Sequence, residues 1–157
     1  MSNTIRLSPI LAMLVFCSCS STNRENIEYI IYGTFAGECV GHCATMYKLE
    51  ETRVLVDTSD SFFDNYGRSI RFNTDTLEKQ YVAQAQAVKQ QLPELLLRSS
   101  SREFGCPDCH DQGGIFIELK SGSTIKRFYI DIELDKIPGE LTDYVKLIRK
   151  TTGFNTL

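Results

Sequence analysis

Four of the six cysteines lie in two short clusters, and each cluster carries one of the two histidines of this 157-residue chain. The first cluster is Cys39-Val-Gly-His-Cys43 and the second is Cys106-Pro-Asp-Cys109-His110. Thiols at these spacings can form disulfides, bind zinc or act as a redox dithiol, and the pattern C-x-x-C-H can also attach haem. No other side chains in the sequence are as well suited to chemistry by type and spacing.

The remaining two cysteines follow an N-terminal segment that is typical of an exported protein. Arg6 supplies a positive charge, and the run from Leu7 to Phe16 is mostly apolar. This run has the length of a signal-peptide core, roughly 7–15 residues, and is shorter than the ~20 residues that span a bilayer. The Cys-Ser-Cys that follows resembles the lipobox of bacterial lipoproteins, in which a small residue precedes the lipid-modified cysteine. A serine precedes Cys19, whereas bulky Phe16 precedes Cys17, so we expect the lipid on Cys19.

This interpretation divides the chain into three parts. We expect a lipoprotein signal peptide over residues 1–18, a polar tether over residues 19–26 and a single domain over residues 27–157. A chain of about 150 residues can bury roughly 68–70% of its unfolded surface, so the domain does not need cysteines merely to fold. Acyl chains on Cys19 would anchor the protein stably, because two or more chains exceed the marginal membrane binding of one. The expected location is the bacterial cell envelope, on the outer membrane.

Disulfides are one interpretation of the domain cysteines, because an exported chain lies in an oxidising compartment. Four cysteines allow three pairings. In the chain-entropy model, each bond between the clusters contributes about 4 kcal/mol, against about 2 kcal/mol for Cys39–Cys43 or Cys106–Cys109. The larger stabilisation favours pairing between clusters. The distances between the cysteines decide the pairing, however, and the sequence does not contain these distances.

Three other interpretations stay open. The segment from Cys106 to His110 satisfies the haem-attachment pattern, although Gly113-Gly114 and a strand follow it, whereas cytochrome c domains carry the motif on a helix. The four thiols could hold zinc, although structural zinc sites more often use two C-x-x-C knuckles. A thioredoxin-like dithiol requires a helix start, where the helix dipole lowers the thiol pKa, and here a loop leads into a strand.

The charged residues exclude some partners. The net charge is −3, and the longest basic clusters are the pairs Lys126-Arg127 and Arg149-Lys150. Nucleic-acid binding needs Lys and Arg clustered on one face, so we expect no nucleic-acid partner and treat both pairs as ordinary solvated positions. The acids from Asp57 to Asp64 lack the spacing of an EF-hand and predict a solvated loop. The alternating acids from Asp131 to Asp135 predict the solvent-facing side of a strand.

Hydrophobic periodicity predicts the elements that position the two clusters. Ile27 to Gly33 is typical of a buried strand, and the runs 46–49 and 54–56 flank a polar hairpin tip. A capping box at Asp75 precedes apolar residues at helical spacing up to Leu92, and a final helix opens at 138–139 and ends at Gly153. The order predicts an α+β fold, with a mostly antiparallel sheet built from two hairpins and two amphipathic helices packed on one face.

The second hairpin can be predicted residue by residue. Apolar residues alternate with polar ones in two runs on either side of Gly122-Ser123. A two-residue turn at this point puts both apolar sets on one face, and it pairs Ile117 with Phe128 and Glu118 with Arg127. Between the first hairpin and the first helix, residues 58–73 predict a packed connection with one short strand near Ile70.

The first cysteine cluster also carries a family resemblance. Gly37-Glu-Cys39-Val-Gly41-His-Cys43, followed by Tyr47, is similar to the G-x-C-x-G-x-C-P-x-Y signature of an uncharacterised domain family found mainly in lipoproteins of Bacteroidota. Ala44 stands in place of the proline, and Tyr47 lies one residue later than in the signature. The resemblance covers roughly residues 27–152 and implies no established activity. The family's fixed cysteines correspond to Cys39 and Cys43.

The function expected from these observations is binding rather than catalysis. The chain contains no G-x-S-x-G, Walker, G-x-G-x-x-G or H-E-x-x-H motif, so we expect no catalytic residues and no cofactor. The leading hypothesis is an envelope lipoprotein, attached to the membrane by its lipid, whose disulfide-stabilised domain binds a protein partner in the envelope. The alternative is a redox protein or a metal- or haem-handling protein that uses the Cys39/Cys43 and Cys106/Cys109 clusters.

Overall fold

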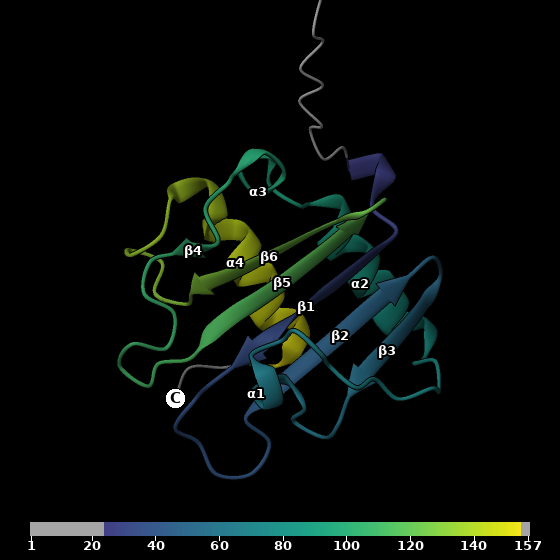
Figure 1. The fold of residues 1–157 in the computed structure, drawn as a ribbon, viewed down its shortest axis with the longest axis horizontal. Helices are drawn as coiled ribbons and strands as arrows, with labels where there is room; N and C mark the ends of the chain where they lie inside the picture. Colours follow the sequence, from purple (N-terminus) through teal and green to yellow (C-terminus); the bar gives the residue numbers. More distant parts are fainter. Residues whose placement is uncertain (1–23, 155–157) are drawn as a thin grey trace, which may run out of the picture.

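Six strands form one mostly antiparallel sheet in the order β3-β2-β1-β5-β6-β4 in the computed structural model, which describes residues 24–154 (Figure 1). The strands are β1 (Tyr29–Phe35), β2 (Ala44–Glu50), β3 (Arg53–Asp57), β4 (Glu103–Phe104), β5 (Gly114–Ser121) and β6 (Thr124–Asp131). The helices are α1 (Phe62–Asn65), α2 (Lys79–Gln90), α3 (Glu94–Arg98) and α4 (Gly139–Thr152). The α+β class and the mostly antiparallel sheet are confirmed.

The domain makes contacts as far back as Arg24. A short 3₁₀ helix, η1 (Arg24–Asn26), precedes β1, and the Arg24 guanidinium donates a hydrogen bond to the Leu92 carbonyl at 2.6 Å. The predicted signal peptide, the lipidation site at Cys19 and most of the predicted tether lie outside the described residues. Within residues 24–154, no helix is both long enough and apolar enough to span a bilayer.

Strand β1 lies in the middle of the sheet and joins its two halves. It pairs antiparallel with β2 on one side and with β5 on the other, so the sheet extends beyond the two predicted hairpins. The sequence of β1 has few polar positions because both of its faces are covered. Gly33 is required here, since a Cβ at this position would overlap the Thr45 carbonyl oxygen of β2.

The hairpin of β5 and β6 has the predicted register. Ile117 lies opposite Phe128, and Glu118 lies opposite Arg127. The two-residue turn follows at Gly122-Ser123, with Gly122 at a φ of 56°. A positive φ at the first turn residue matches the right-handed twist of the strands, and glycine adopts it without steric cost.

Helices α2 and α4 pack against the same face of the sheet, behind it in Figure 1. Helix α4 follows Pro138 and ends with Gly153 in the left-handed conformation, as predicted. Helix α2 begins at Lys79, later than the predicted capping box at Asp75. The reason is that the Leu77 N–H donates to the Val54 carbonyl at 2.9 Å, which holds the preceding residues beside the edge strand β3.

The opposite face of the sheet is covered only in part. The connection after β3 crosses the lower part of this face in Figure 1, and Phe62 of α1 packs with Phe35 and Phe116 in a small second core. Ile70 packs against this core without forming the predicted strand. The part of the face formed by β6 has no helix over it and remains open.

The acidic loop from Asp57 to Asp64 is not fully solvated, which corrects the expectation for Asp57. This side chain is buried and accepts hydrogen bonds from the Ser59 N–H at 2.8 Å and the Ser61 hydroxyl at 2.7 Å. Burial alone would raise the pKa of Asp57, but the hydrogen bonds from the two serines lower it below its usual value. Asp57 therefore anchors the start of the connection that covers the sheet.

Candidate binding site

The four domain cysteines form two local disulfides, Cys39–Cys43 and Cys106–Cys109, with Cα atoms 5.6 and 5.5 Å apart. Pairing between the clusters, which would contribute more in the chain-entropy model, does not occur. While both disulfides are intact, the four sulfurs offer no thiolate to zinc and no thiol to haem. In the described part of the chain, no group of three or more His, Cys, Asp and Glu residues could hold a metal ion.

The two cystine loops lie side by side at one end of the sheet. The loop after β1 and the loop before β5 meet because Phe35 pairs directly with Gly114. Asp108 joins the loops: one carboxylate oxygen accepts the Gly37 N–H at 2.6 Å and the other accepts the Gly113 N–H at 3.0 Å. Figure 1 places this end of the sheet away from η1.

Asp131, the last residue of β6, fixes the second cystine loop in place. Its carboxylate accepts the backbone N–H groups of Cys106 and Glu133, each at 2.9 Å. Gln112 adds a third contact, because its amide donates to the Cys106 carbonyl at 2.8 Å. The prediction that Asp131 faces solvent was wrong: the residue is 1% exposed. A loop next to the sheet covers this position, which alternation within the strand does not reveal.

The two histidines lie on the outside of these loops. His42 is exposed, and its Nδ1 lies 3.6 Å from the Asp60 carboxylate. His110 is also exposed, and its backbone N–H donates to the Gln112 side chain at 2.7 Å. Neither imidazole lines the hollow described next, so the structure does not place them in a shared site.

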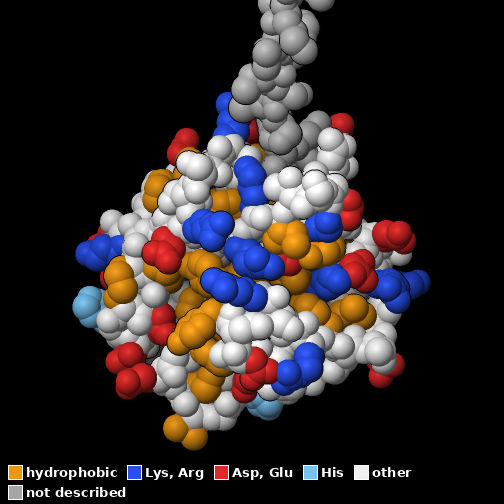
Figure 2. Space-filling model, in the orientation of Figure 1, with side chains coloured by type: hydrophobic (Ala, Val, Ile, Leu, Met, Phe, Trp, Pro, Cys, Tyr) orange, Lys and Arg blue, Asp and Glu red, His pale blue; other side chains and the backbone are white. Residues whose placement is uncertain are grey.

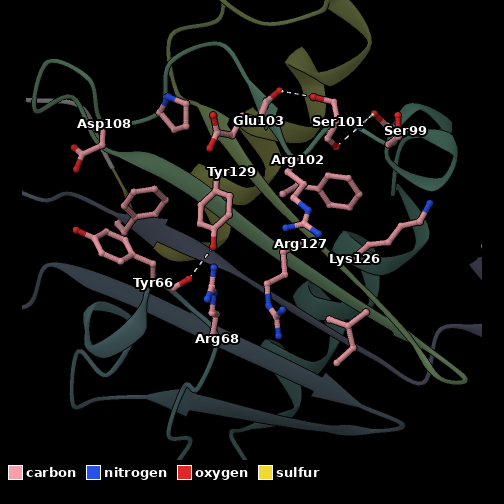
Figure 3. A pocket seen from close by; sticks show the side chains of 15 residues that line it. Tyr66, Arg68, Ser99, Ser101, Arg102, Glu103, Asp108, Lys126, Arg127 and Tyr129 are labelled. Atoms are coloured by element: carbon pink, nitrogen blue, oxygen red, sulfur yellow. Dashed lines mark hydrogen bonds between the residues drawn. The ribbon is translucent and has the colours of Figure 1, made fainter.

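A hollow of about 820 Å³ opens on the uncovered face of the sheet, beside the second cystine loop (Figure 3). Strand β6 contributes residues 125–129, and the segment 99–103 that leads through β4 forms one wall. Tyr66 and Arg68, which follow α1, form the opposite wall. Pro107 and Asp108 bring the cystine loop to the rim. Segments that are distant in the sequence therefore meet around this space.

Basic side chains outnumber acidic ones in the hollow. Its basic residues are Arg68, Arg102, Lys126 and Arg127, and its acidic residues are Glu103 and Asp108. Figure 2 shows Lys and Arg side chains gathered near the middle of this face, although the whole chain carries a net charge of −3. Guanidinium groups with free donors bind carboxylate, sulfate and phosphate, often through two parallel hydrogen bonds.

Only Arg127 among the four basic residues has a carboxylate partner within residues 24–154. Its Nε lies 2.6 Å from the buried Glu118 carboxylate, its cross-strand neighbour. The Lys126 ammonium donates to the Leu97 carbonyl at 2.5 Å, which holds it without neutralising it. Arg68 and Arg102 form no ion pair in the described chain, so their charges are available to a ligand.

Glu118 also orders the residues behind Arg127. Its second oxygen accepts the Tyr29 hydroxyl at 2.8 Å, and the Lys48 ammonium lies 4.4 Å from the centre of the Tyr29 ring. Burial, together with the hydrogen bond to Glu118, raises the pKa of Tyr29 to about 12. The phenol is therefore a permanent donor at neutral pH, and it leaves the other Glu118 oxygen to Arg127.

Tyr66 and Tyr129 provide aromatic surface in the hollow. The Tyr129 hydroxyl donates to the Tyr66 carbonyl at 2.7 Å, and burial raises the pKa of Tyr129. Tyr66 itself has a φ of 52°, an unfavourable conformation for a bulky residue, and the residue is 67% exposed. Such strain persists where the surrounding structure enforces it and is concentrated at functional sites. Here it ends α1 and leaves the Tyr66 ring at the hollow.

The sequence contains no local pattern that marks this site. It predicts that Lys126-Arg127 is an ordinary solvated pair, but Arg127 is ion-paired and both residues line the hollow. Arg68 and Arg102 are single basic residues in unrelated segments, so no local pattern connects them. Strand β4, which brings Arg102 beside β6 through parallel pairing of Phe104 with Ile130, has only two residues and no detectable sequence signal.

Comparisons of the chain with protein-family models, with curated proteins and with solved structures find no match.

Proposed function

We propose that this protein is a lipid-anchored binding protein of the bacterial cell envelope, and that the cationic hollow binds a ligand through an anionic group. The lipobox-like segment around Cys19 supports the anchor, and the two disulfides are compatible with an oxidising compartment. The observation that carries the binding function is the presence of Arg68 and Arg102, without carboxylate partners in residues 24–154, on opposite walls of one hollow.

The hollow has the properties of a ligand site rather than of a catalytic one. Its volume lies within the roughly 300–1,000 Å³ of ligand pockets. Its donors come from arginine and lysine side chains. Of its two acidic residues, Glu103 and Asp108, the second already accepts two backbone N–H groups. Neither histidine lines it. This set of groups can hold an anion but does not supply an activated nucleophile with its base.

A sulfate titration tests the binding function. The full chain, purified in a non-ionic detergent, is titrated with sodium sulfate at constant ionic strength, and backbone amide chemical shifts are recorded. We expect saturable shifts in residues 66–68, 99–103 and 125–129. The double variant Arg68→Gln/Arg102→Gln should lose them, whereas Lys79→Gln/Lys146→Gln, which removes the same charge from the helices on the other face, should keep them. Shifts that do not saturate, or that both variants retain, would refute the proposal.

The redox alternative has less support. Cys106 and Cys109 are exposed, as an exchangeable disulfide must be. However, the loop that contains them leads into β5 and not into a helix, so this pair lacks the helix start at which a thioredoxin-like dithiol lies. The disulfide is better explained as a brace that holds Pro107 and Asp108 at the rim of the hollow.

A further inference from the structure

We propose that the ligand of the cationic hollow is an acidic saccharide, that is, a short sugar chain bearing carboxylate groups. This inference rests on the proposed binding function and specifies its ligand class. Three features of the hollow support it together: an exposed aromatic ring, donors for an anion, and a carboxylate that can accept hydrogen bonds from hydroxyl groups.

The aromatic ring belongs to Tyr66. It lines the hollow, is 67% exposed and is held by a backbone conformation that few bulky residues adopt. The face of an aromatic ring is partly negative and attracts the weakly positive C–H groups on the flat side of a sugar. A bare inorganic anion would gain nothing from this surface, so the ring indicates a ligand that has an organic body as well as a charge.

The donors surround the same space. In Figure 3, the Arg102 side chain lies to the right of the Tyr129 ring and above Arg127, while Arg68 lies below the Tyr129 hydroxyl. Side chains of Ser99 and Ser101 belong to the same wall as Arg102. A carboxylate can take paired hydrogen bonds from a guanidinium group. The Ser99 and Ser101 hydroxyls already donate to the backbone carbonyls of Ser101 and Glu103, so they offer acceptor oxygens to the hydroxyl groups of a sugar.

Glu103 distinguishes a saccharide from a polyphosphate. Its exposed carboxylate lines the hollow and has no hydrogen-bonded or ion-paired partner of its own among residues 24–154. A carboxylate accepts hydrogen bonds and donates none, so it suits the hydroxyl groups of a sugar, whereas an ionised phosphate chain offers it no donor. The combination of unneutralised arginines and one free carboxylate therefore matches a ligand that carries both negative charges and hydroxyl donors.

The test compares three probes by isothermal titration calorimetry on the full chain in non-ionic detergent. Trigalacturonate carries carboxylates on a sugar chain, maltotriose is a neutral trisaccharide, and sodium sulfate is an anion without a sugar. We expect trigalacturonate to bind at least ten-fold more tightly than either of the others. Arg68→Gln/Arg102→Gln should lose at least ten-fold in trigalacturonate affinity, and Lys79→Gln/Lys146→Gln should stay within two-fold of the wild type.

The variant Tyr66→Asn separates the sugar from the charge. Asparagine tolerates a positive φ better than tyrosine and keeps the backbone carbonyl that Tyr129 uses, so the variant should fold at least as well as the wild type. We expect it to lose at least five-fold in trigalacturonate affinity while sulfate binding changes less than two-fold. If the affinities for trigalacturonate and sulfate fall by the same factor, the Tyr66 ring does not contact the sugar and its proposed role is wrong.

The remaining outcomes distinguish this inference from the proposed function. If sulfate binds as tightly as trigalacturonate to the wild type, the saccharide inference is wrong and anion binding stands. If maltotriose binds with the same affinity as trigalacturonate, the ligand's charge does not contribute to binding, and the anionic part of both proposals is wrong. If no probe binds, both proposals fail.

Discussion

The Asp108 carboxylate accepts the backbone N–H of Gly37 at 2.6 Å, across 71 positions of sequence. Its other oxygen accepts the Gly113 N–H within its own loop. One side chain thereby fixes the two cystine loops to each other, and it also lies on the rim of the hollow. The stability of this end of the domain should depend on Asp108 as much as on the disulfides.

The variant Asp108→Ala should lower the free energy of unfolding by about 1–3 kcal/mol, because it leaves two N–H groups without their charged acceptor. Urea unfolding followed by circular dichroism measures the loss. Asp111→Ala is a matched control, since Asp111 also has a φ near 60° but no hydrogen bond to its carboxylate within residues 24–154. The control should lose less stability than Asp108→Ala, because it shares the cost of alanine at a positive φ but breaks no side-chain hydrogen bond. Similar losses in both variants would assign the effect to backbone strain rather than to the bridge.

The local disulfide pairing predicts the products of a non-reducing digest. Trypsin can cut after Lys48 and Arg102, among many other sites, so each cystine should stay within one peptide. We expect two separate peptides, one with Cys39 and Cys43 and one with Cys106 and Cys109, each two hydrogens lighter than after reduction. Mass spectrometry checks this. A single linked product that separates only on reduction would show pairing between the clusters.

The ion pair between Arg127 and buried Glu118 predicts a non-additive pair of mutations. Arg127→Met should destabilise the domain by about 1–3 kcal/mol, because it leaves a desolvated carboxylate without its cation. Adding Glu118→Gln removes the buried charge and should restore at least half of the loss. Urea unfolding of both single variants and the double variant forms the thermodynamic cycle. Additive losses would mean that the two side chains are not coupled.

Tyr29 predicts how stability changes in alkaline solution. Its pKa is raised to about 12 in the folded domain, from about 10 when unfolded. Between these two values the unfolded chain releases the phenolic proton while the folded domain keeps it. The stabilisation that Tyr29 contributes to the folded domain is therefore fully present below pH 10 and is lost as the pH rises through 12. Urea midpoints measured at pH 8 and pH 11 should therefore show Tyr29→Phe less stable than the wild type at pH 8, with a smaller difference at pH 11. A difference that grows with pH would contradict this assignment.

The lipid anchor predicts fatty-acid labelling at one cysteine. Metabolic labelling with a radioactive fatty acid should mark the wild type and Cys17→Ala, while Cys19→Ala should lose the label. Cys17→Ala serves as the control for the substitution itself. Label that persists in Cys19→Ala and disappears in Cys17→Ala would move the modification to Cys17.

Local pattern was enough to predict much of the sheet. The pairing of Glu118 with Arg127 follows from two alternating runs and the length of the turn between them, since a shift of one residue would turn the apolar side chains to solvent. The end of α4 at Gly153 could likewise be predicted, because glycine accepts the left-handed conformation that closes a helix. The start of α2 could not, because the Leu77 N–H bonds to Val54 of another element.

The environment of individual acids was harder to predict. Asp131 alternates with apolar neighbours as a solvent-facing residue does, yet a loop 25 positions away covers it and donates the Cys106 N–H to it. Asp57 is the last residue of β3 and borders a loop, yet it is buried because serines of that loop donate hydrogen bonds to it. Strand periodicity describes one element, and burial depends on what other elements lie above it.

The sequence alone establishes the α+β class, the register of the second hairpin and the presence of four cysteines in the domain, because these depend on side chains that are near one another in the chain. The tertiary structure decides which cysteines pair, by closing each loop on itself and joining the two loops through Asp108. It also creates the cationic hollow by bringing Arg68 and Arg102 to the same space beside β6. A site made by distant residues has no local periodicity, so it becomes visible only when the chain is folded.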